Sequence, residues 1–385
     1  MTSSEIRVLR IITRMNLGGP AWQSSVLTRE LASEGFVTRL VCGEISADEA
    51  DFLLHRGHEL SVKQIPLMGR SLSVGGDFRT LAALSREIAD FRPHIAHTHT
   101  AKAGVLGRIA AVTRRVPVRV HTFHGHLLQG YFSPMKTRAI RLVESVLAKG
   151  TTALVAVGEQ VRDDLIAAGI GRSDQYTVIP PGVDHPEIVP DGDQARRQLG
   201  LPLEVPVVLF VGRLTKIKRP DRLLEAMTLV LRRLPDTILL VAGGGELLDS
   251  VRSSASELGD SVRFLGWRDD LATLSAAADV AVISSDNEGM PVTLIEAAAA
   301  GLPAVTTDVG SAGEVVEHEK TGYVVAPTAS ALADGLCTLL SNPPLRDQMG
   351  VNARRRAAEL FGVERLVADH TDLYRRLMMT KRLTT

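Results

Sequence analysis

Two glutamates separated by seven residues, Glu288 and Glu296, bracket the start of a segment with the pattern of a helix. Pro291 suits the first helical position, and Gly301 suits the position just after the last turn. A helix that begins here presents free backbone N–H groups to an anion such as a diphosphate. Glu296 then lies more than one turn inside a nearly all-apolar helix, where a bare carboxylate is costly. We expect the two glutamates to bind a ligand; the alternative is a capping acid and a core ion pair.

A cluster of positive charge follows the apolar run 207–211, in the segment Gly212-Arg213-Leu214-Thr215-Lys216-Ile217-Lys218-Arg219-Pro220. Arg213 and Lys218 would lie near the carboxyl end of a strand, where open α/β sheets bind ligands. Arginine binds phosphate through two donors, and lysine acts as a compact charge. This pair therefore suits a phosphate-rich leaving group. Lys216 and Arg219 are expected to be solvated, and the alternative is that all four are surface charges.

Histidines are concentrated in one stretch of the chain, at positions 94, 97, 99, 121, 124 and 126. Imidazole suits zinc or iron, but no carboxylate or thiol lies nearby at ligand spacing. We therefore expect no metal and place these histidines at strand ends that converge on a cleft. His124 can hydrogen-bond a substrate hydroxyl or share a proton near neutral pH. The alternative is a structural histidine in a loop.

Strands and helices alternate around these residues, which is typical of parallel sheets covered by helices. The segment Val178 to Pro190 carries four prolines and interrupts the pattern, so it predicts a linker. The length of 385 residues agrees with more than one domain. Before the linker the pattern predicts strands at 7–13, 37–42, 94–97, 118–122 and 153–157, with helices at 21–33, 79–92, 103–111 and 136–148. After it the pattern predicts strands at 207–211, 238–242, 262–265, 280–283 and 304–306, with helices at 220–234, 271–277, 291–300 and 363–379.

Composition excludes several classes of protein. Lys and Arg number 44 and Asp and Glu number 44, so the net charge is zero and nucleic acid is not an expected partner. No apolar run approaches the roughly 20 residues of a membrane span, and the N-terminus lacks the layout of a signal peptide. Cys42 and Cys337 are far apart and form no metal or disulfide pattern, so we expect a cytoplasmic protein.

Three weaker motifs carry less weight. Asp191-Gly192-Asp193 has the spacing of some metal sites, but it lies among prolines and is expected to be a turn. The run Gly243–Gly245 is not a dinucleotide-binding fingerprint. The segment 136–149 predicts a basic amphipathic helix, which either lies on an anionic membrane surface or packs with one solvated face.

Taken together, the motifs resemble those of the retaining GT-B glycosyltransferases of family four. The resemblance covers nearly the whole chain. The Gly-Arg…Lys loop and the Glu-x7-Glu element are its specific part, and Pro181 stands where the family usually has Asn. The other matching segments are Gly18-Gly19, Pro93–His99, Val178–Asp184, Gly310–Glu314 and Thr321–Val325.

The resemblance implies two Rossmann-like domains that face each other across a cleft. The N-terminal domain, 1–180, would hold the acceptor, 181–190 would be the hinge, and 191–362 would hold the donor. The last helix, 363–385, would pack back on the first domain.

The resemblance also assigns roles. Catalytic roles fall to His124, Arg213, Lys218 and Glu288, and no metal or cofactor beyond the nucleotide-sugar is implied. Donor binding is implied for Gly18, Gly19, Arg213, Lys218, Gly244, Trp267, Arg268, Glu288, Gly289, Met290, Pro291, Val292, Thr293 and Glu296.

The implied reaction moves a sugar, with retention, from a nucleotide-sugar to a glycan, a lipid-linked molecule or a small molecule. We favour a uridine nucleotide, bacterial polysaccharide or lipid-linked glycan assembly, and a site of action in the cytoplasm at the inner face of the membrane. The alternatives are a nucleotide-sugar epimerase or a phosphorylase on the same fold, an NAD-dependent oxidoreductase and a non-catalytic sugar-nucleotide-binding subunit.

Overall fold

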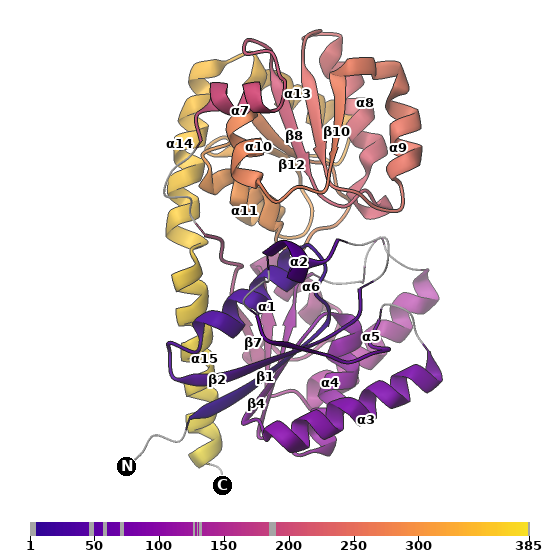
Figure 1. Cartoon of the computed structure of the whole chain (residues 1–385), viewed down its shortest axis with the longest axis vertical. Helices are drawn as coiled ribbons and strands as arrows, with labels where there is room; N and C mark the ends of the chain where they lie inside the picture. The colour runs from indigo at the N-terminus through magenta and orange to yellow at the C-terminus, as the bar shows by residue number, and fades with distance from the viewer. Residues whose placement is uncertain are drawn as a thin grey trace. The chain divides into compact units, whose positions relative to one another are not determined.

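The computed structural model describes residues 5–383 apart from 46–49, 57–59, 70–72, 126–127, 129, 131–132 and 185–189. The chain forms two compact units (Figure 1). The first unit contains Met1–Gly182 and Val363–Thr385, and the second contains Val183–Gly362. The chain therefore enters the second unit within the segment 181–190, where the prolines predict a hinge, and returns at Val363.

A parallel sheet of seven strands, in the order β3-β2-β1-β4-β5-β6-β7, forms the centre of the first unit. Its strands are β1 (Ile6–Arg14), β2 (Phe36–Gly43), β3 (Val62–Gln64), β4 (Ile95–His99), β5 (Val118–Phe123), β6 (Ala153–Ala156) and β7 (Tyr176–Val178). Its helices are α1 (Gly19–Glu30), α2 (Phe52–Arg56), α3 (Val74–Phe91), α4 (Ala101–Thr113), α5 (Pro134–Lys149), α6 (Glu159–Ala167), η1 (Ser173–Gln175) and α15 (Val363–Leu383).

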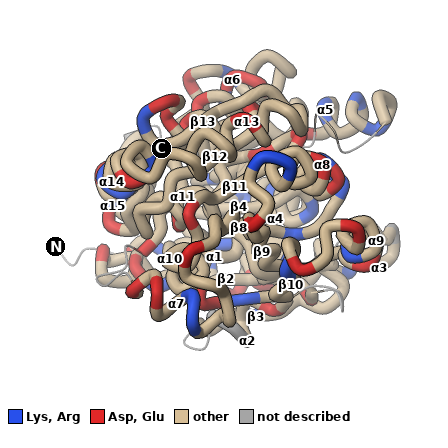
Figure 2. The backbone as a smooth tube through the Cα atoms, turned by 90° about the horizontal axis from the view of Figure 1, so that it is seen from above, with Lys and Arg blue, Asp and Glu red and all other residues tan. Residues whose placement is uncertain are grey.

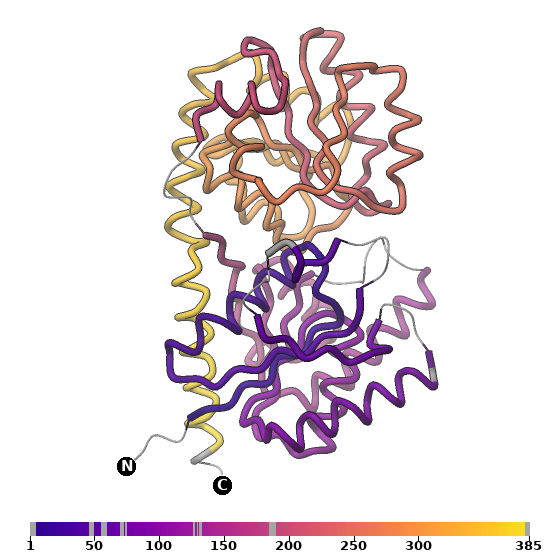
Figure 3. The backbone as a smooth tube through the Cα atoms, viewed as in Figure 1, coloured from indigo at the N-terminus to yellow at the C-terminus, as the bar shows by residue number. Residues whose placement is uncertain are grey.

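The last helix, α15, packs on this first sheet although it follows the second unit in sequence. Leu366, Leu373 and Tyr374 are buried in the same core as residues of α1, β1, β4 and β5, and Figure 3 shows the helix beside the first strands. Each such side chain stabilises the packing by roughly 1.5–3 kcal/mol. Arg365 adds hydrogen bonds to the carbonyls of Pro180 and Pro181, at 2.7 and 3.0 Å.

The second unit contains a parallel sheet of six strands, in the order β10-β9-β8-β11-β12-β13. Its strands are β8 (Val207–Val211), β9 (Ile238–Ala242), β10 (Val262–Gly266), β11 (Val280–Ile283), β12 (Ala304–Thr307) and β13 (Gly322–Val325). Its helices are α7 (Gly192–Gln198), η2 (Lys216–Lys218), α8 (Pro220–Leu231), α9 (Leu248–Ser254), η3 (Ala255–Ser261), α10 (Leu271–Ala277), α11 (Val292–Ala299), α12 (Ala312–Val315), α13 (Ala329–Leu340) and α14 (Pro343–Leu360).

Both sheets reverse their strand order next to their first strand, between β1 and β4 and between β8 and β11. This order is that of a Rossmann-like fold, in which ligands bind beyond the carboxyl ends of the strands at the reversal point. Strands buried on both faces by helices read as continuous apolar runs, as in Val207–Val211. The predicted fold class, two Rossmann-like α/β domains, is confirmed.

Two local features bear on the weaker motifs. Asp191 is the N-cap of α7, where its carboxylate accepts a hydrogen bond from the Gln194 amide at 2.8 Å, so the prediction of a turn at Asp191–Asp193 is wrong. An aspartate with a glycine after it serves equally well before a helix. Separately, none of the helices described has the length and apolar character required to cross a bilayer.

Candidate functional site

Lys218 and Glu288 meet at the reversal point of the second sheet. Lys218 ends the η2 turn after β8, and Glu288 lies in the loop after β11. The Lys218 ammonium donates to Glu288 Oε1 at 2.6 Å, and the Ser285 hydroxyl donates to the same oxygen. Glu288 is only 8% exposed, so these two bonds offset the loss of hydration that its carboxylate suffers. The charge expected at this sheet edge is therefore present as an ordered ion pair.

A second set of contacts ties these two loops together. The Ser284 hydroxyl donates to the Lys218 carbonyl at 2.8 Å, and the Asp286 amide donates to the Ile217 carbonyl at 2.8 Å. Arg222, which is nearly buried, donates to the Ser284 carbonyl at 2.7 Å and to Asp286 Oδ1 at 2.6 Å. Local sequence patterns do not identify Arg222 and Asp286 as partners, although the one is a cation two positions after Pro220 and the other an acid two positions before Glu288.

Gly310, in the loop after β12, lies directly against Glu288. Its φ is 51°, and a Cβ there would lie 1.8 Å from the Glu288 carbonyl oxygen. The amide of the next residue, Ser311, donates to the Gly289 carbonyl at 3.0 Å. Only glycine allows this approach, so the position of the Glu288 loop depends on it.

Helix α11 begins one residue later than predicted, because Pro291 is its N-cap, with φ −73° and ψ 105°. The amides of Val292 and Thr293 belong to the first turn, where a helix offers N–H groups no acceptor of its own. Met290 and Pro291 are buried, which fixes the chain as it enters the helix. A helix start close to the one expected from the sequence is thus present, and it follows Glu288 in the chain.

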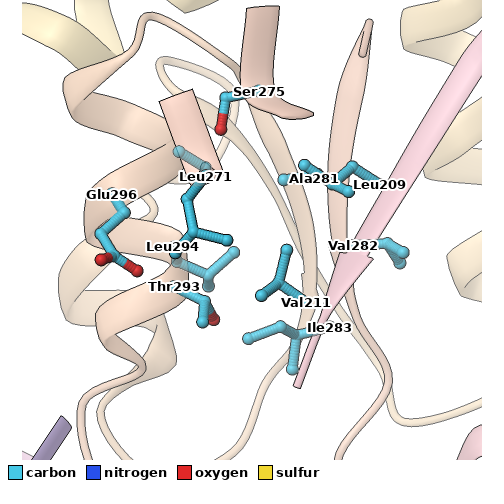
Figure 4. Close-up of a pocket in the computed structure, with 11 residues that line it drawn as sticks. Leu209, Val211, Leu271, Ser275, Ala281, Val282, Ile283, Thr293, Leu294 and Glu296 are labelled. Atoms are coloured by element: carbon cyan, nitrogen blue, oxygen red, sulfur yellow. The ribbon is translucent and has the colours of Figure 1, made fainter. Parts of the chain in front are cut away.

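Glu296 lines a small pocket between α10, α11 and the strands β8 and β11 (Figure 4). Its polar lining is Ser275, Thr293 and Glu296, and the remainder is apolar. Glu296 is half-buried, and in Figure 4 its carboxylate points away from the strand residues that line the pocket.

Glycines bring the strand-end loops of the second unit close together. A Cβ on Gly244 would lie 2.8 Å from Nε1 of Trp267, and one on Gly243 would lie 2.0 Å from the Gly212 carbonyl oxygen. Gly244 and Trp267 are therefore neighbours, next to the loop that carries the exposed Arg213.

Arg268 is paired with Asp270, a partner that the sequence did not reveal. Its Nε donates to Asp270 Oδ1 at 2.7 Å and its Nη2 donates to Oδ2 at 2.5 Å. The hydrogen bonds from Arg268 lower the pKa of Asp270 below its ordinary value. The charge that Arg268 offers a ligand is therefore partly neutralised.

The first unit contains Gly18, Gly19 and His124 at the carboxyl edge of its own sheet. Gly19 is the first residue of α1, with Gly18 as its N-cap. His124 follows β5, and its Nε2 lies 3.0 Å from Nδ1 of His99 at the end of β4. Burial lowers the pKa of His124 to about 3, so its ring is neutral at physiological pH.

Two further histidines of the first unit, His97 and His121, pair with hydroxyl groups. His97 lies between Tyr374 and Thr122, at 2.5 and 2.7 Å, and His121 bonds Thr98 at 2.8 Å on the opposite face of the sheet. Across the part of the chain that the structure describes, no three His, Cys, Asp or Glu side chains are arranged to hold a metal. His126 lies outside the described residues.

Comparison with known proteins finds matches to both units of the chain. Residues 191–356 match the model "Glycosyl transferases group 1", and residues 18–182 match "Glycosyl transferase 4-like domain". The chain is 28% identical, over 99% of each sequence, to the UDP-Gal:alpha-D-GlcNAc-diphosphoundecaprenol alpha-1,3-galactosyltransferase of Escherichia coli. It is 32% identical, over 68% of each sequence, to a D-inositol 3-phosphate glycosyltransferase of Corynebacterium jeikeium.

Solved structures share the fold over nearly the whole chain. The sucrose-phosphate synthase of Thermosynechococcus elongatus aligns with a TM-score of 0.83 and 24% identity, over 98% of this chain and 100% of the other. Anabaena HepE in complex with UDP-glucose aligns with a TM-score of 0.82 and 22% identity, over 97% and 100%. The predicted glycosyltransferase activity is confirmed, and none of these comparisons supports the alternatives. The chain belongs to the group 1 glycosyltransferases of the GT-B fold.

Proposed function

We propose that this glycosyltransferase moves a hexose from a UDP-sugar to a lipid-linked diphosphate acceptor with retention at the anomeric carbon. The observation that carries the proposal is the Lys218–Glu288 pair next to the start of α11, at the reversal point of the second sheet. The Escherichia coli relative, named for a UDP-Gal donor and a diphosphoundecaprenol acceptor, supports the choice of nucleotide and acceptor class.

The donor's two phosphates would meet Arg213, Lys218 and the amides of Val292 and Thr293. These groups are aimed at charge that develops as the diphosphate leaves, which is the most effective use of a fixed cation or amide. Pairing with Glu288 uses one of the three N–H donors of Lys218. A phosphate oxygen can therefore join the pair without displacing Glu288.

Two carboxylates would bind the hydroxyl groups of the donor, one those of the transferred sugar and the other those of the ribose. Glu288 accepts hydrogen bonds from hydroxyls of the transferred sugar, and the half-buried Glu296 accepts from the ribose hydroxyls. Trp267, Arg268 and the backbone at Gly244 line the nucleoside side. The backbone of Gly289, Met290 and Pro291 would lie between the groups that bind the sugar and those that bind the phosphates.

In the proposed step the bond between the anomeric carbon and the diphosphate oxygen breaks as the acceptor oxygen bonds to the same face of the sugar. The acceptor's proton passes to the departing diphosphate oxygen. The cations and helix start stabilise that oxygen while it carries charge. Neither a metal nor another cofactor has a role in this step.

Donor identity is tested by thermal shift with a panel of UDP-, GDP- and ADP-sugars, since a ligand that binds the native state raises its melting temperature. We expect stabilisation by a UDP-hexose only. The stabilising donor is then incubated with a prenyl diphosphate-linked sugar or with an inositol phosphate, each in the presence of EDTA. Transfer to the prenyl acceptor, with the anomeric configuration preserved in the product's NMR couplings, supports the proposal. An inverted product, dependence on a metal, or turnover of donor without acceptor contradicts it.

A lipid-linked acceptor requires the enzyme to reach a membrane surface, and α5 offers a suitable face. Met135, Leu142 and Val146 are 82%, 67% and 57% exposed and are spaced to lie on one side of the helix. Along the same helix Lys136, Arg138, Arg141 and Lys149 are exposed (Figure 2), whereas its only acid, Glu144, is buried against Arg108 at 2.6 Å. Exposed apolar and basic groups without exposed acids match an anionic lipid surface. We therefore propose that α5 docks the enzyme on the cytoplasmic face of the membrane.

Vesicle sedimentation tests this docking. We expect the protein to sediment with phosphatidylglycerol vesicles and not with phosphatidylcholine vesicles. A Leu142→Ser/Val146→Ser variant should remain in the supernatant. The control is Val351→Ser on α14, which removes a side chain that is 70% exposed in the second unit. Equal sedimentation of the double variant and the native protein contradicts the role of α5.

A further inference from the structure

His99 and His124 lie beside each other at the carboxyl edge of the first sheet, where the neighbouring strands β4 and β5 end. The two rings face each other with Nδ1 of His99 3.0 Å from Nε2 of His124. His99 is fully buried, and its other nitrogen, Nε2, has no hydrogen-bond partner among the residues that the structure describes. Because two neutral imidazoles share this bond, one nitrogen must carry the proton and the other must accept it.

The unpartnered nitrogen of His99 decides between the two arrangements. If His99 accepted at Nδ1, its own proton would sit on the buried Nε2 as an N–H without an acceptor. Buried N–H groups left unpaired are rarer in proteins than buried acceptors left unpaired. We propose that His99 donates from Nδ1 to Nε2 of His124, so that His124 carries its proton on Nδ1 and offers the substrate a hydrogen-bond donor. His99 is thereby a positioning residue for this site.

The surroundings of His99 hold it neutral. Its ring stacks on His97 at 4.3 Å between centroids. Burial lowers its pKa well below the ordinary value, and His97, His124, Arg10 and His121 act in the same direction. All of these groups are cationic when charged, so a proton added to His99 meets repulsion from its neighbours. A doubly protonated ring, which would donate from both nitrogens, is therefore excluded at physiological pH.

The backbone next to His99 is also fixed. Thr100 has φ 65° and ψ 164°, a combination that few residues other than glycine adopt. Its hydroxyl lies 2.7 Å from that of Thr13, and the Thr13 amide donates to it at 3.1 Å. A strained residue that its neighbours hold in place is a feature of functional sites. The backbone that follows His99 is thus held in place by Thr13.

The role of His124 toward substrate rests on the proposed function. The proton position on His124 then determines what its ring can do to the substrate. A neutral N–H donor binds an oxygen of the substrate but does not remove a proton. The acceptor's proton is then left to the departing diphosphate, in agreement with the proposed reaction. The same N–H donor also selects for substrates with an oxygen at the contacted position.

The proton positions are measured directly by long-range ¹H–¹⁵N NMR of the native protein labelled with [¹⁵N]histidine, at pH 7.5. Signals are assigned by their loss in His99→Asn and His124→Asn variants. We expect His124 to be neutral and protonated on Nδ1, and His99 to be neutral and protonated on Nδ1. Protonation of His124 on Nε2, or on both nitrogens, overturns the proposal. This result does not depend on transferase activity, so it remains decisive even if the proposed reaction is wrong.

Kinetics of two His99 variants supply the functional test. His99→Phe keeps the ring that stacks on His97 but removes both nitrogens. His99→Asn places an amide N–H near the position of Nδ1. We expect kcat to fall about tenfold in the phenylalanine variant with the donor KM unchanged, and to return to within about threefold in the asparagine variant. An unchanged kcat in His99→Phe overturns the proposal. Melting temperatures of both variants identify any loss that comes from unfolding.

Discussion

The two sheets of this enzyme share one strand order, but the carboxyl edge of the second carries charged side chains and that of the first carries neutral ones. In the second unit, the edge at β8 and β11 carries the charged residues Lys218, Glu288 and Arg213, of which Glu288 is buried and the two cations are at least partly open to solvent. In the first unit, the edge at β4 and β5 carries His99 and His124, which are neutral and linked to each other. The same fold therefore provides two chemically distinct sites.

This difference follows from what each edge is proposed to bind. A departing diphosphate gains negative charge, and fixed cations stabilise it most. An acceptor hydroxyl carries no charge, so the site needs only to orient it. A neutral hydrogen-bonding group can do this without the desolvation penalty of a buried charge. Variants that add or remove charge at the second edge should therefore strongly change the rate of transfer. Changes of pH should mainly change the stability of the first unit.

The largest effect is expected for Lys218→Ala, which removes a cation from the proposed diphosphate site and leaves the buried Glu288 without its cationic partner. We expect transfer to fall at least about 100-fold, mainly in kcat, because loss of a charge stabiliser is felt most in the transition state. Steady-state rates with a UDP-sugar measure it. Lys216→Ala, an exposed cation two residues earlier, is the control and should stay within about twofold. Similar rates for the two variants would contradict the assigned role.

The next effect is expected for Gly310→Ala, which tests how firmly the Glu288 loop is held. The added Cβ would overlap the Glu288 carbonyl oxygen, 1.8 Å away, so the loop must move. Gly259→Ala is a close control, since its φ of 52° nearly equals the 51° of Gly310 but no atom lies within 4 Å of the added Cβ. We expect Gly310→Ala to be less stable than the control by about 2 kcal/mol and about tenfold less active. Denaturant unfolding and transfer rates measure the two effects.

The sequence predicted the strands and the charged strand ends more reliably than the contacts between loops. The strands 207–211, 238–242 and 280–283 were predicted with their observed bounds, because continuous apolar runs mark strands buried on both faces. The three-residue strands β3 and β7 and the helix α14 were missed, since short or weakly periodic segments give little signal. Helix α13 was missed although its buried apolar residues recur at helical spacing.

Side-chain partners were beyond the reach of the sequence for a different reason. Arg222 and Asp286 are 64 residues apart, and His99 and His124 are 25 apart. Their meeting depends on which strands become neighbours in the sheet and on side-chain rotamers, neither of which follows from local periodicity. The sequence could place each residue at a sheet edge, but not identify its partner.

Acid should destabilise the first unit before the second. Burial lowers the pKa of His124 and His370 to about 3, whereas an unfolded histidine titrates near 6.5. The unfolded state therefore binds protons that the native state refuses. The stabilisation by these neutral rings is complete above about pH 6.5 and is lost as the pH falls toward 3. Each ring contributes a slope of up to about 1.4 kcal/mol per pH unit.

The two tryptophans allow this comparison to be measured, since Trp22 lies in the first unit and Trp267 in the second. Thermal unfolding of single-tryptophan variants, followed by fluorescence from pH 7.5 to 4.5, should show a steeper loss of stability for the Trp22 signal. A His370→Met variant should reduce that slope, because it removes one of the titrating groups. Parallel shifts of both signals would show that the buried histidines do not control acid stability.

The smallest effect is expected for Arg268→Ala, which tests whether Arg268 has a different role from Lys218 at the second edge. Arg268 is paired with Asp270 through two hydrogen bonds, so much of its charge is already neutralised. Lys218 also has an acidic partner, but it is proposed to meet the phosphates themselves. We expect Arg268→Ala to raise the donor KM by about two- to fivefold and to leave kcat unchanged, as for a group that binds ground state and transition state equally.

Asp270→Asn is the informative partner variant, since it releases the arginine and should lower the donor KM. A fall in kcat on the scale of Lys218→Ala would place Arg268 among the groups that act on the leaving diphosphate, and the division of roles at this edge would then be wrong.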